Sequence, residues 1–149
     1  MQAKPARHSV DLSAYPDLVV IYLGFRVTRW RGLLTLLGLA PGIRGVARDR
    51  PDGLLAHENV LFGLNHVGMR QYWRDLPSLE RFTRSAPHSG WWRDFLRDTG
   101  GSGFWHETYS RAGMEAIYVA MPEPTGFGLF APARRPEGPF LSARARLAA

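Results

Sequence analysis

The ten residues from Leu18 to Val27 constrain the fold of this chain more than any other segment. They read Leu-Val-Val-Ile-Tyr-Leu-Gly-Phe-Arg-Val and are rich in β-branched and aromatic residues, which favours a strand. Side chains alternate between the two faces of a strand, and here apolar side chains fall on both faces. The segment therefore predicts a strand that is covered on both sides, in a sheet that needs two covering layers.

The remaining sequence alternates between helical and strand-like patterns. In chain order we expect a helix at 30–48, strands at 54–62 and 67–73, helices at 75–84 and 89–98, and strands at 104–111 and 114–121. Pro41 should start a second helix or kink the first, because proline removes a helical hydrogen bond. Asp75 is a suitable N-cap, and Ala112-Gly113 predicts a hairpin between the last two strands.

This order of elements is that of an α+β, ferredoxin-like βαββαβ fold with an extra strand at its end. Right-handed crossovers place both helical regions on the same face of the sheet. The other face then needs a second sheet, and a second copy of the chain is the economical source. We therefore expect a face-to-face homodimer in which each subunit keeps a pocket between its sheet and its helices.

The length of 149 residues fits a single folded domain. Residues 1–16 are polar and predict an N-terminal arm, and residues 17–128 hold all of the periodic segments. Residues 129–149 form a Pro/Arg-rich tail without periodicity, for which disorder is a simpler expectation than an ordered arm across a partner subunit.

Composition excludes several classes of protein. The chain has no Cys, which excludes disulfides, thiolate metal sites and a cysteine nucleophile, and which fits a cytoplasmic location. Its longest uncharged apolar stretch, residues 32–43, is shorter than the roughly 20 residues that span a bilayer, so no membrane partner is expected. The net charge of +6 is spread along the chain without a basic block, so we expect no nucleic-acid partner.

The histidines do not predict a dedicated metal site. They are His8, His57, His66, His88 and His106, and no two have the spacing that places neighbours on one face of a strand or helix. A lone His106 could still serve as an axial ligand of haem, because that role requires one histidine and not a cluster of ligands. The glycine-rich stretch at 100–103 follows a helix and precedes a strand, the reverse of a phosphate-binding loop.

Candidate chemistry concentrates in the strand at 104–111. Its alternation places His106 on one face and both Glu107 and Tyr109 on the other, so the pocket holds either His106 or Glu107 but not both. The alternative is a buried polar network in which Glu107 pairs with Arg26 or Arg70 across the sheet.

Five short motifs give the chain a family resemblance. They are Leu-Gly-Phe-Arg-Val at 23–27, Gln-Tyr-Trp-Arg at 71–74, Trp-Arg-Asp-Phe at 92–95, His-Glu-Thr-Tyr at 106–109 and Glu-Ala-Ile-Tyr at 115–118. With these motifs in this order, the chain resembles the fumagillin-pathway monooxygenase-like family, formerly a domain of unknown function. That family is similar to the antibiotic-biosynthesis monooxygenases of the dimeric α+β barrel superfamily. The resemblance covers roughly residues 15–128.

The resemblance implies a dimeric barrel of natural-product biosynthesis that oxidises or rearranges a hydrophobic metabolite. Some relatives use no cofactor, because the substrate enolate or phenolate gives an electron to O₂ while the protein supplies a dry pocket, a base and an anion stabiliser. Another branch, which resembles aldoxime dehydratases, carries haem on a histidine. That branch keeps haem as an alternative cofactor here, with His106 as its ligand.

We therefore expect a cofactor-independent monooxygenase, an oxidoreductase that acts on a hydrophobic polyketide, terpenoid or aromatic intermediate. The alternatives are a non-oxidative cyclase, isomerase or dehydratase for the same kind of substrate, and a protein that binds haem or another small ligand. His106 is the expected general base, Arg26 would hold the developing anion, and Glu107 would orient His106 or belong to the dimer network. Tyr22, Trp73, Tyr109 and Tyr118 are the residues expected to line the pocket, with the core as the alternative for Tyr22 and Trp73.

Overall fold

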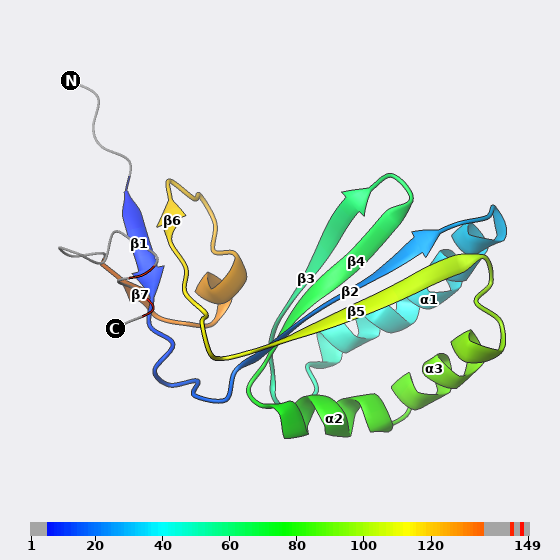
Figure 1. Ribbon diagram of the computed structural model, residues 1–149, viewed down its shortest axis with the longest axis horizontal. Coiled ribbons are helices and arrows are strands. Elements are labelled where there is room, and N and C mark those ends of the chain that lie inside the picture. Colours follow the sequence, from blue (N-terminus) through cyan, green and yellow to red (C-terminus); the bar gives the residue numbers. More distant parts are fainter. Residues whose placement is uncertain (1–5, 136–143, 145–146, 148–149) are drawn as a thin grey trace. The chain divides into compact units, whose positions relative to one another are not determined.

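A computed structural model of the chain describes residues 6–135, 144 and 147 (Figure 1). Its contacts divide the chain into two compact units. The larger unit is Asp17–Tyr109, and the smaller combines Met1–Pro16 with Ser110–Ala149. Among the described residues, no helix combines the length and the apolar character that crossing a bilayer would need.

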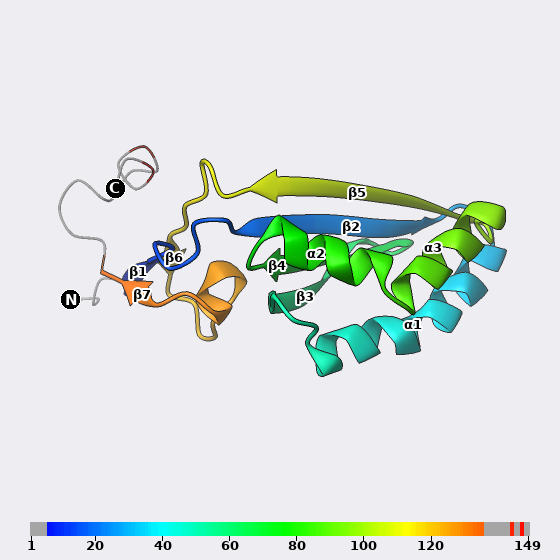
Figure 2. The same ribbon diagram turned by 90° about the horizontal axis from the view of Figure 1, so that it is seen from below.

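The larger unit is a four-stranded sheet with helices on one of its faces. The strands are β2 (Val19–Val27), β3 (Leu54–Gly63), β4 (His66–Trp73) and β5 (Ser102–Ser110), and the helices are α1 (Arg31–Asp49), α2 (Leu76–Arg84) and α3 (His88–Arg97). The strand order is β3-β4-β2-β5, and β2 and β3 both pair antiparallel with β4. Figure 2 shows the helices together on one side of the sheet. This arrangement confirms the expected α+β, ferredoxin-like fold.

Strand β2 has buried side chains on both of its faces. Val19, Ile21 and Leu23 point toward the helices and join Met69, Trp73 and Leu79 in the main core. On the opposite face, Val20 and Tyr72 are also buried, with 5% and 2% of their surfaces exposed. The prediction of a strand that is apolar on both faces is therefore confirmed.

Helix α1 continues through Pro41 as one element of 19 residues, so the expected second segment does not form, and the alternative of a kink stays a prediction. Proline removes one backbone donor and leaves the carbonyl four residues earlier, that of Leu37, without its helical partner. The Leu37 side chain is 63% exposed, so water can reach this side of the helix and satisfy the freed carbonyl. Exposure on the solvent side explains why the helix is not broken.

The turn between α3 and β5 is fastened to the start of α1. Gly100 and Gly101 have φ angles of 61° and 80°, which glycine adopts without strain. The carbonyl of Gly101 accepts hydrogen bonds from the backbone N–H groups of Thr28 and Arg29, and the Thr35 hydroxyl donates to the carbonyl of Gly100 at 3.0 Å. These contacts fix the point at which β5 enters the sheet.

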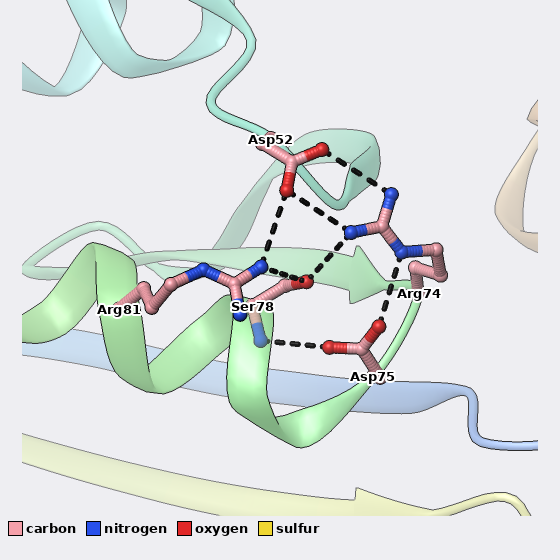
Figure 3. A network of polar contacts seen from close by, with 5 residues as sticks. All are labelled: Asp52, Arg74, Asp75, Ser78 and Arg81. Atoms are coloured by element: carbon pink, nitrogen blue, oxygen red, sulfur yellow. Dashed lines mark hydrogen bonds and ion pairs between the residues drawn. The ribbon is translucent and has the colours of Figure 1, made fainter.

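A polar network holds the start of α2 against the turn that precedes β3 (Figure 3). The Asp75 carboxylate caps α2 by accepting the backbone N–H of Ser78 at 2.7 Å, as the sequence predicted. Arg74 and Arg81 both bind the Asp52 carboxylate, at 3.0 and 3.1 Å. Both also donate to the Ser78 hydroxyl at 3.0 Å. The network positions α2, which carries part of the wall of the site described below.

The smaller unit contains a three-stranded sheet of very short strands. These are β1 (Arg7–Val10), β6 (Tyr118–Val119) and β7 (Ala133–Arg134), in the order β6-β1-β7, with a 3₁₀ helix η1 at Gly126–Leu129. Strand β1 lies within the expected N-terminal arm, and β7 lies within the expected tail. Most of that tail, like residues 1–5 of the arm, lies outside the described residues.

The extra strand expected at 114–121 differs in both length and partner. It comprises only Tyr118–Val119 and pairs with β1, so the expected hairpin with the preceding strand does not form. The reason lies in the turn, where the Met114 N–H donates to the Arg111 carbonyl and only Gly113 of the two central residues has a positive φ, of 79°. Such a turn splays the chains, whereas tight hairpins need a positive φ at the first central residue.

The cap of α2 gives a prediction about stability. Replacing Asp75 by Ala removes the acceptor for the Ser78 N–H and should lower the free energy of unfolding by about 1 kcal/mol in urea titrations at pH 7. Asp75→Asn keeps a capping oxygen and should lose less. An Ala variant as stable as the wild type would contradict the role of the cap.

The charge of the same carboxylate predicts a pH dependence. Hydrogen bonds from Ser78 and then from Arg74 lower the pKa of Asp75 from 3.8 to about 2. Because the folded-state pKa is the lower one, the stabilisation is complete above pH 4 and is lost as the pH falls toward 2. Asp75→Asn should remove this component from the acid unfolding profile, measured by circular dichroism.

Candidate functional site

A cavity of about 450 Å³ lies between the helix-facing side of the main sheet and all three helices of the larger unit. Most of its lining is apolar. Its wall includes Leu23 and Phe25 from β2, Ile43 from α1, Phe82 from α2, and Trp91 and Phe95 from α3. Four polar residues also line it, namely Gln71, Thr83, His88 and His106. Its size and apolar character are those of a site for a small organic molecule.

His106 reaches the cavity from β5. The alternation of this strand points Phe104 and His106 toward the helices, so of His106 and Glu107 it is His106 that lines the cavity. Part of the ring is exposed at the rim, and His106 makes no hydrogen bond to another described residue. Burial of the ring, and then repulsion from His88 when that ring is protonated, lower the pKa of His106 below 6.5. The ring is therefore neutral near pH 7 and able to accept a proton from a ligand.

His88 begins α3 and faces the same cavity. Its Nδ1 lies 3.2 Å from the carbonyl oxygen of Thr83, and because a carbonyl only accepts, Nδ1 must carry the proton. The lone pair of the neutral ring is then on Nε2. The ring packs against Phe82 and Trp91, and burial lowers its pKa below 6.5. Sequence reasoning gave no role to His88, because its distance of 18 residues from His106 carries no periodic signal.

Gln71 and Trp73 lie side by side on the helix-facing side of β4. Gln71 is 3% exposed, and its side-chain oxygen accepts the indole N–H of Trp73 at 3.1 Å. Trp73 is completely buried in the core, where its ring packs 5.2 Å from that of Phe82. Trp73 therefore does not line the cavity itself but contacts Gln71, which does. Gln71 is not among the site residues that the sequence predicts.

The opposite face of the sheet carries a separate polar cluster. Arg70 donates to the Glu58 carboxylate at 2.8 Å and to the Tyr22 hydroxyl at 2.8 Å. Glu107 accepts a short hydrogen bond from the hydroxyl of Tyr109. The alternative that paired Glu107 with Arg26 or Arg70 is therefore wrong for Arg70, because the register of β3 and β4 places Glu58 directly opposite Arg70.

The other predicted site residues lie away from the cavity. Strand alternation puts the exposed Arg26 on the same face as Glu107, and Tyr22 and Tyr109 meet edge to face there at 6.0 Å. Tyr118 belongs to the smaller unit, where it stacks on His8 and lines a second cavity of about 290 Å³. A catalytic or substrate-binding role for any of these residues would require a ligand next to it, and these roles remain predictions.

No described group of three His, Cys, Asp or Glu side chains could jointly hold a metal ion. The two cavity histidines nevertheless offer imidazole nitrogens in apolar surroundings, which is the type of donor that haem iron takes. Between them, His88 is the better prepared ligand, because a carbonyl holds its second nitrogen in the N–H form.

Comparison with known proteins identifies relatives for most of the chain. The profile of a family described as monooxygenase af470-like matches residues 18–127. An aliphatic aldoxime dehydratase of Rhodococcus globerulus is 30% identical over 87 residues, which are 54% of this chain and 24% of that protein.

Solved structures share the fold. The crystal structure of an aldoxime dehydratase with butyraldoxime has a TM-score of 0.71 at 23% identity, covering 99% of this chain and 44% of that one. A protein of unknown function from Bacteroides thetaiotaomicron, described as a possible oxidoreductase, has a TM-score of 0.51 at 9% identity, with 64% and 98% covered. The chain spans less than half of either aldoxime dehydratase.

The proximity of the two histidines predicts a change in titration. In His88→Gln, the charge that opposes protonation of His106 is absent, so the pKa of His106 should rise while burial still holds it below 6.5. The shift can be followed by NMR through the Cε1 proton of the ring. The control is His66→Gln on the opposite face, where glutamine keeps an acceptor for the indole N–H of Trp105. An unchanged or lowered pKa in His88→Gln would show that the two rings are not coupled.

Proposed function

The chain belongs to the monooxygenase af470-like family, and from this premise we propose that it is a tailoring enzyme of natural-product biosynthesis. The family match also confirms the resemblance that the sequence motifs indicated. The proposed reaction is oxygenation, without a cofactor, of a hydrophobic polyketide, terpenoid or aromatic intermediate. One observation carries the proposal, namely a neutral histidine at the rim of a largely apolar cavity of about 450 Å³.

The proposed chemistry requires from the protein a base and an apolar cavity that excludes water. His106 accepts a proton from the substrate, which becomes an enolate or a phenolate, and this anion gives one electron to O₂. The resulting carbon radical and superoxide combine into a hydroperoxide, and loss of water from it leaves a new carbonyl group. The substrate thus supplies all of the electrons that reduce O₂. A base is useful near neutral pH when its pKa lies close to or below the working pH, as burial ensures for His106. The apolar wall excludes water and so strengthens the few polar contacts that are made inside the cavity.

A second candidate function is a non-oxidative dehydration supported by haem. It is favoured by the orientation of His88, whose Nε2 lone pair is fixed by the Thr83 carbonyl, and by the aldoxime dehydratase relative. Bound haem would supply an iron atom able to coordinate a donor atom of the substrate. In this alternative His88 would hold the haem and His106 would remain free to exchange a proton with the substrate.

We also propose that two copies pair through the sheet face that carries no helix. Aromatic side chains gather there, and two of them, Phe62 and Tyr109, are 41% and 47% exposed. Phe62 packs on Trp105, and Tyr109 meets Tyr22, so the exposed rings are continuous with others on the same face. A second copy would bury these rings. It would also cover the second apolar face of β2, because the helices cover only the first.

Oxygen uptake tests the main proposal. With hydrophobic ketones and phenols that form an enolate or phenolate, the wild-type protein should consume O₂ without added cofactor. His106→Ala should lower the rate by about 100-fold or more, since it lacks the base, whereas His66→Gln should not. The wild-type activity should persist below pH 6.5 and fall only as His106 becomes protonated. A fully active His106→Ala protein would refute the assignment, and a Soret band in the purified protein would favour the haem-dependent candidate.

Sedimentation tests the pairing of sheet faces. The wild-type protein should sediment as a dimer, and Phe62→Arg with Tyr109→Arg should yield monomers, because buried like charges oppose association. The matched control is Leu96→Arg, a change at a residue of α3 that is 65% exposed, and it should remain dimeric. A wild-type monomer, or a dimer that survives both charge substitutions, would contradict the proposal.

A further inference from the structure

One polar side chain in the cavity wall is held in a single orientation by its neighbours. The side-chain oxygen of Gln71 accepts the indole N–H of Trp73 at 3.1 Å. An indole nitrogen is a donor only, so a reversed amide would bring two donors together. The carbonyl end of Gln71 therefore points to Trp73, and its NH₂ group points the other way.

One proton of this NH₂ group has a fixed partner. The side-chain nitrogen of Gln71 lies 3.1 Å from Nδ1 of His57, and Nε2 of His57 lies 3.3 Å from the side-chain oxygen of Asn59. An amide oxygen accepts, so His57 carries its proton on Nε2 and offers the lone pair of Nδ1 to Gln71. Burial lowers the pKa of His57, which preserves this neutral form near pH 7. The hydrogen bonds thus run in one direction, from Trp73 through Gln71 and His57 to Asn59.

The second proton of the NH₂ group has a much weaker partner. In the described part of the chain, its acceptor is the thioether sulfur of Met69, at 3.6 Å. Sulfur is a weak acceptor, so exchanging it for an oxygen atom is favourable for a donor that is 3% exposed. Gln71 lines the cavity, and a ligand there could provide that oxygen.

The other three polar residues of the cavity, Thr83, His88 and His106, do not offer a preset donor of this kind. The hydroxyl of Thr83 donates to the carbonyl of Glu80 at 3.0 Å, and the Nδ1 proton of His88 is held by the carbonyl of Thr83. His106 is placed to accept a proton. Gln71 thus differs from these three side chains in holding an N–H group whose direction is set by its neighbours, and the wall also contains the indole N–H groups of Trp91 and Trp92.

We propose that Gln71 is a substrate-binding residue that donates a hydrogen bond to an oxygen atom of the substrate. The substrate class is then narrower than a hydrophobic molecule, because it must be an apolar compound with a carbonyl, enolate or phenolate oxygen. This inference rests on the proposed function of the cavity and adds to it the group that recognises the oxygen. Trp73 and His57 act through Gln71 as positioning residues.

A pair of probes of similar shape tests this inference. The first is 2-acetylnaphthalene, which carries a carbonyl, and the second is 2-ethylnaphthalene, which does not. Calorimetric titration of the protein should show that the ketone binds about 10-fold or more tightly than the hydrocarbon, because the hydrocarbon leaves the N–H of Gln71 with its weak sulfur partner. The carbonyl stretch of the bound ketone should also shift to lower frequency in the infrared spectrum.

Two variants separate the donor from general changes in packing. Gln71→Met keeps much of the shape without the amide, and it should abolish both the preference for the ketone and the infrared shift while the hydrocarbon still binds. Binding of the hydrocarbon shows that the variant is folded with its cavity intact. Met69→Leu removes the competing sulfur at similar volume, and it should keep or increase the preference for the ketone.

The outcomes distinguish this inference from the proposed function. If ketone and hydrocarbon bind the wild-type protein equally and the carbonyl stretch does not shift, Gln71 does not bind the oxygen, although the cavity still takes an apolar ligand. If Gln71→Met keeps the preference, another group recognises the carbonyl. If neither probe binds the wild-type protein, the cavity is no ligand site, and both the proposed function and the role of Gln71 fail.

Discussion

The alternation of side chains along β2 is the constraint on which the rest of this structure depends. A strand with apolar side chains on both faces is stable only inside a layered arrangement, and here one face packs against three helices. The same alternation in β4 and β5 separates two kinds of chemistry. The helix-facing side holds Gln71 and His106 in an apolar cavity, while the other side holds the ion pair of Arg70 and Glu58.

The apolar wall of the cavity determines how its few polar groups behave. Burial lowers the pKa of His88 and His106, so both rings are neutral and can act as bases or ligands near pH 7. Fixed partners then distinguish the groups from one another, because the Thr83 carbonyl sets the tautomer of His88 and Trp73 sets the orientation of Gln71. A cavity of this kind selects its guest by apolar contact and places the reacting atoms by a small number of hydrogen bonds.

Much of the fold could be predicted from the sequence, because its helices and strands show a periodic pattern of apolar residues within short segments. The strands of the main sheet, the cap at Asp75 and the separation of His106 and Glu107 onto opposite faces of β5 follow from side-chain patterns that hold within a few residues. What could not be predicted depends on distant partners or on exact turn geometry. The approach of His88 to His106 and the contact of Gln71 with His57 arise only when separate elements pack, and the strand at 118–119 pairs with β1 because the turn at Gly113 opens the expected hairpin.

The most direct test of the account is a crystal structure of the protein grown with 1-bromonaphthalene, whose bromine can be located by anomalous scattering. The account predicts a bromine peak between the helices and the sheet, inside the cavity lined by Leu23, Trp91 and His106. A cavity filled by the side chains of Phe82 and Trp91, or a ligand seated only on the opposite face of the sheet, would contradict it.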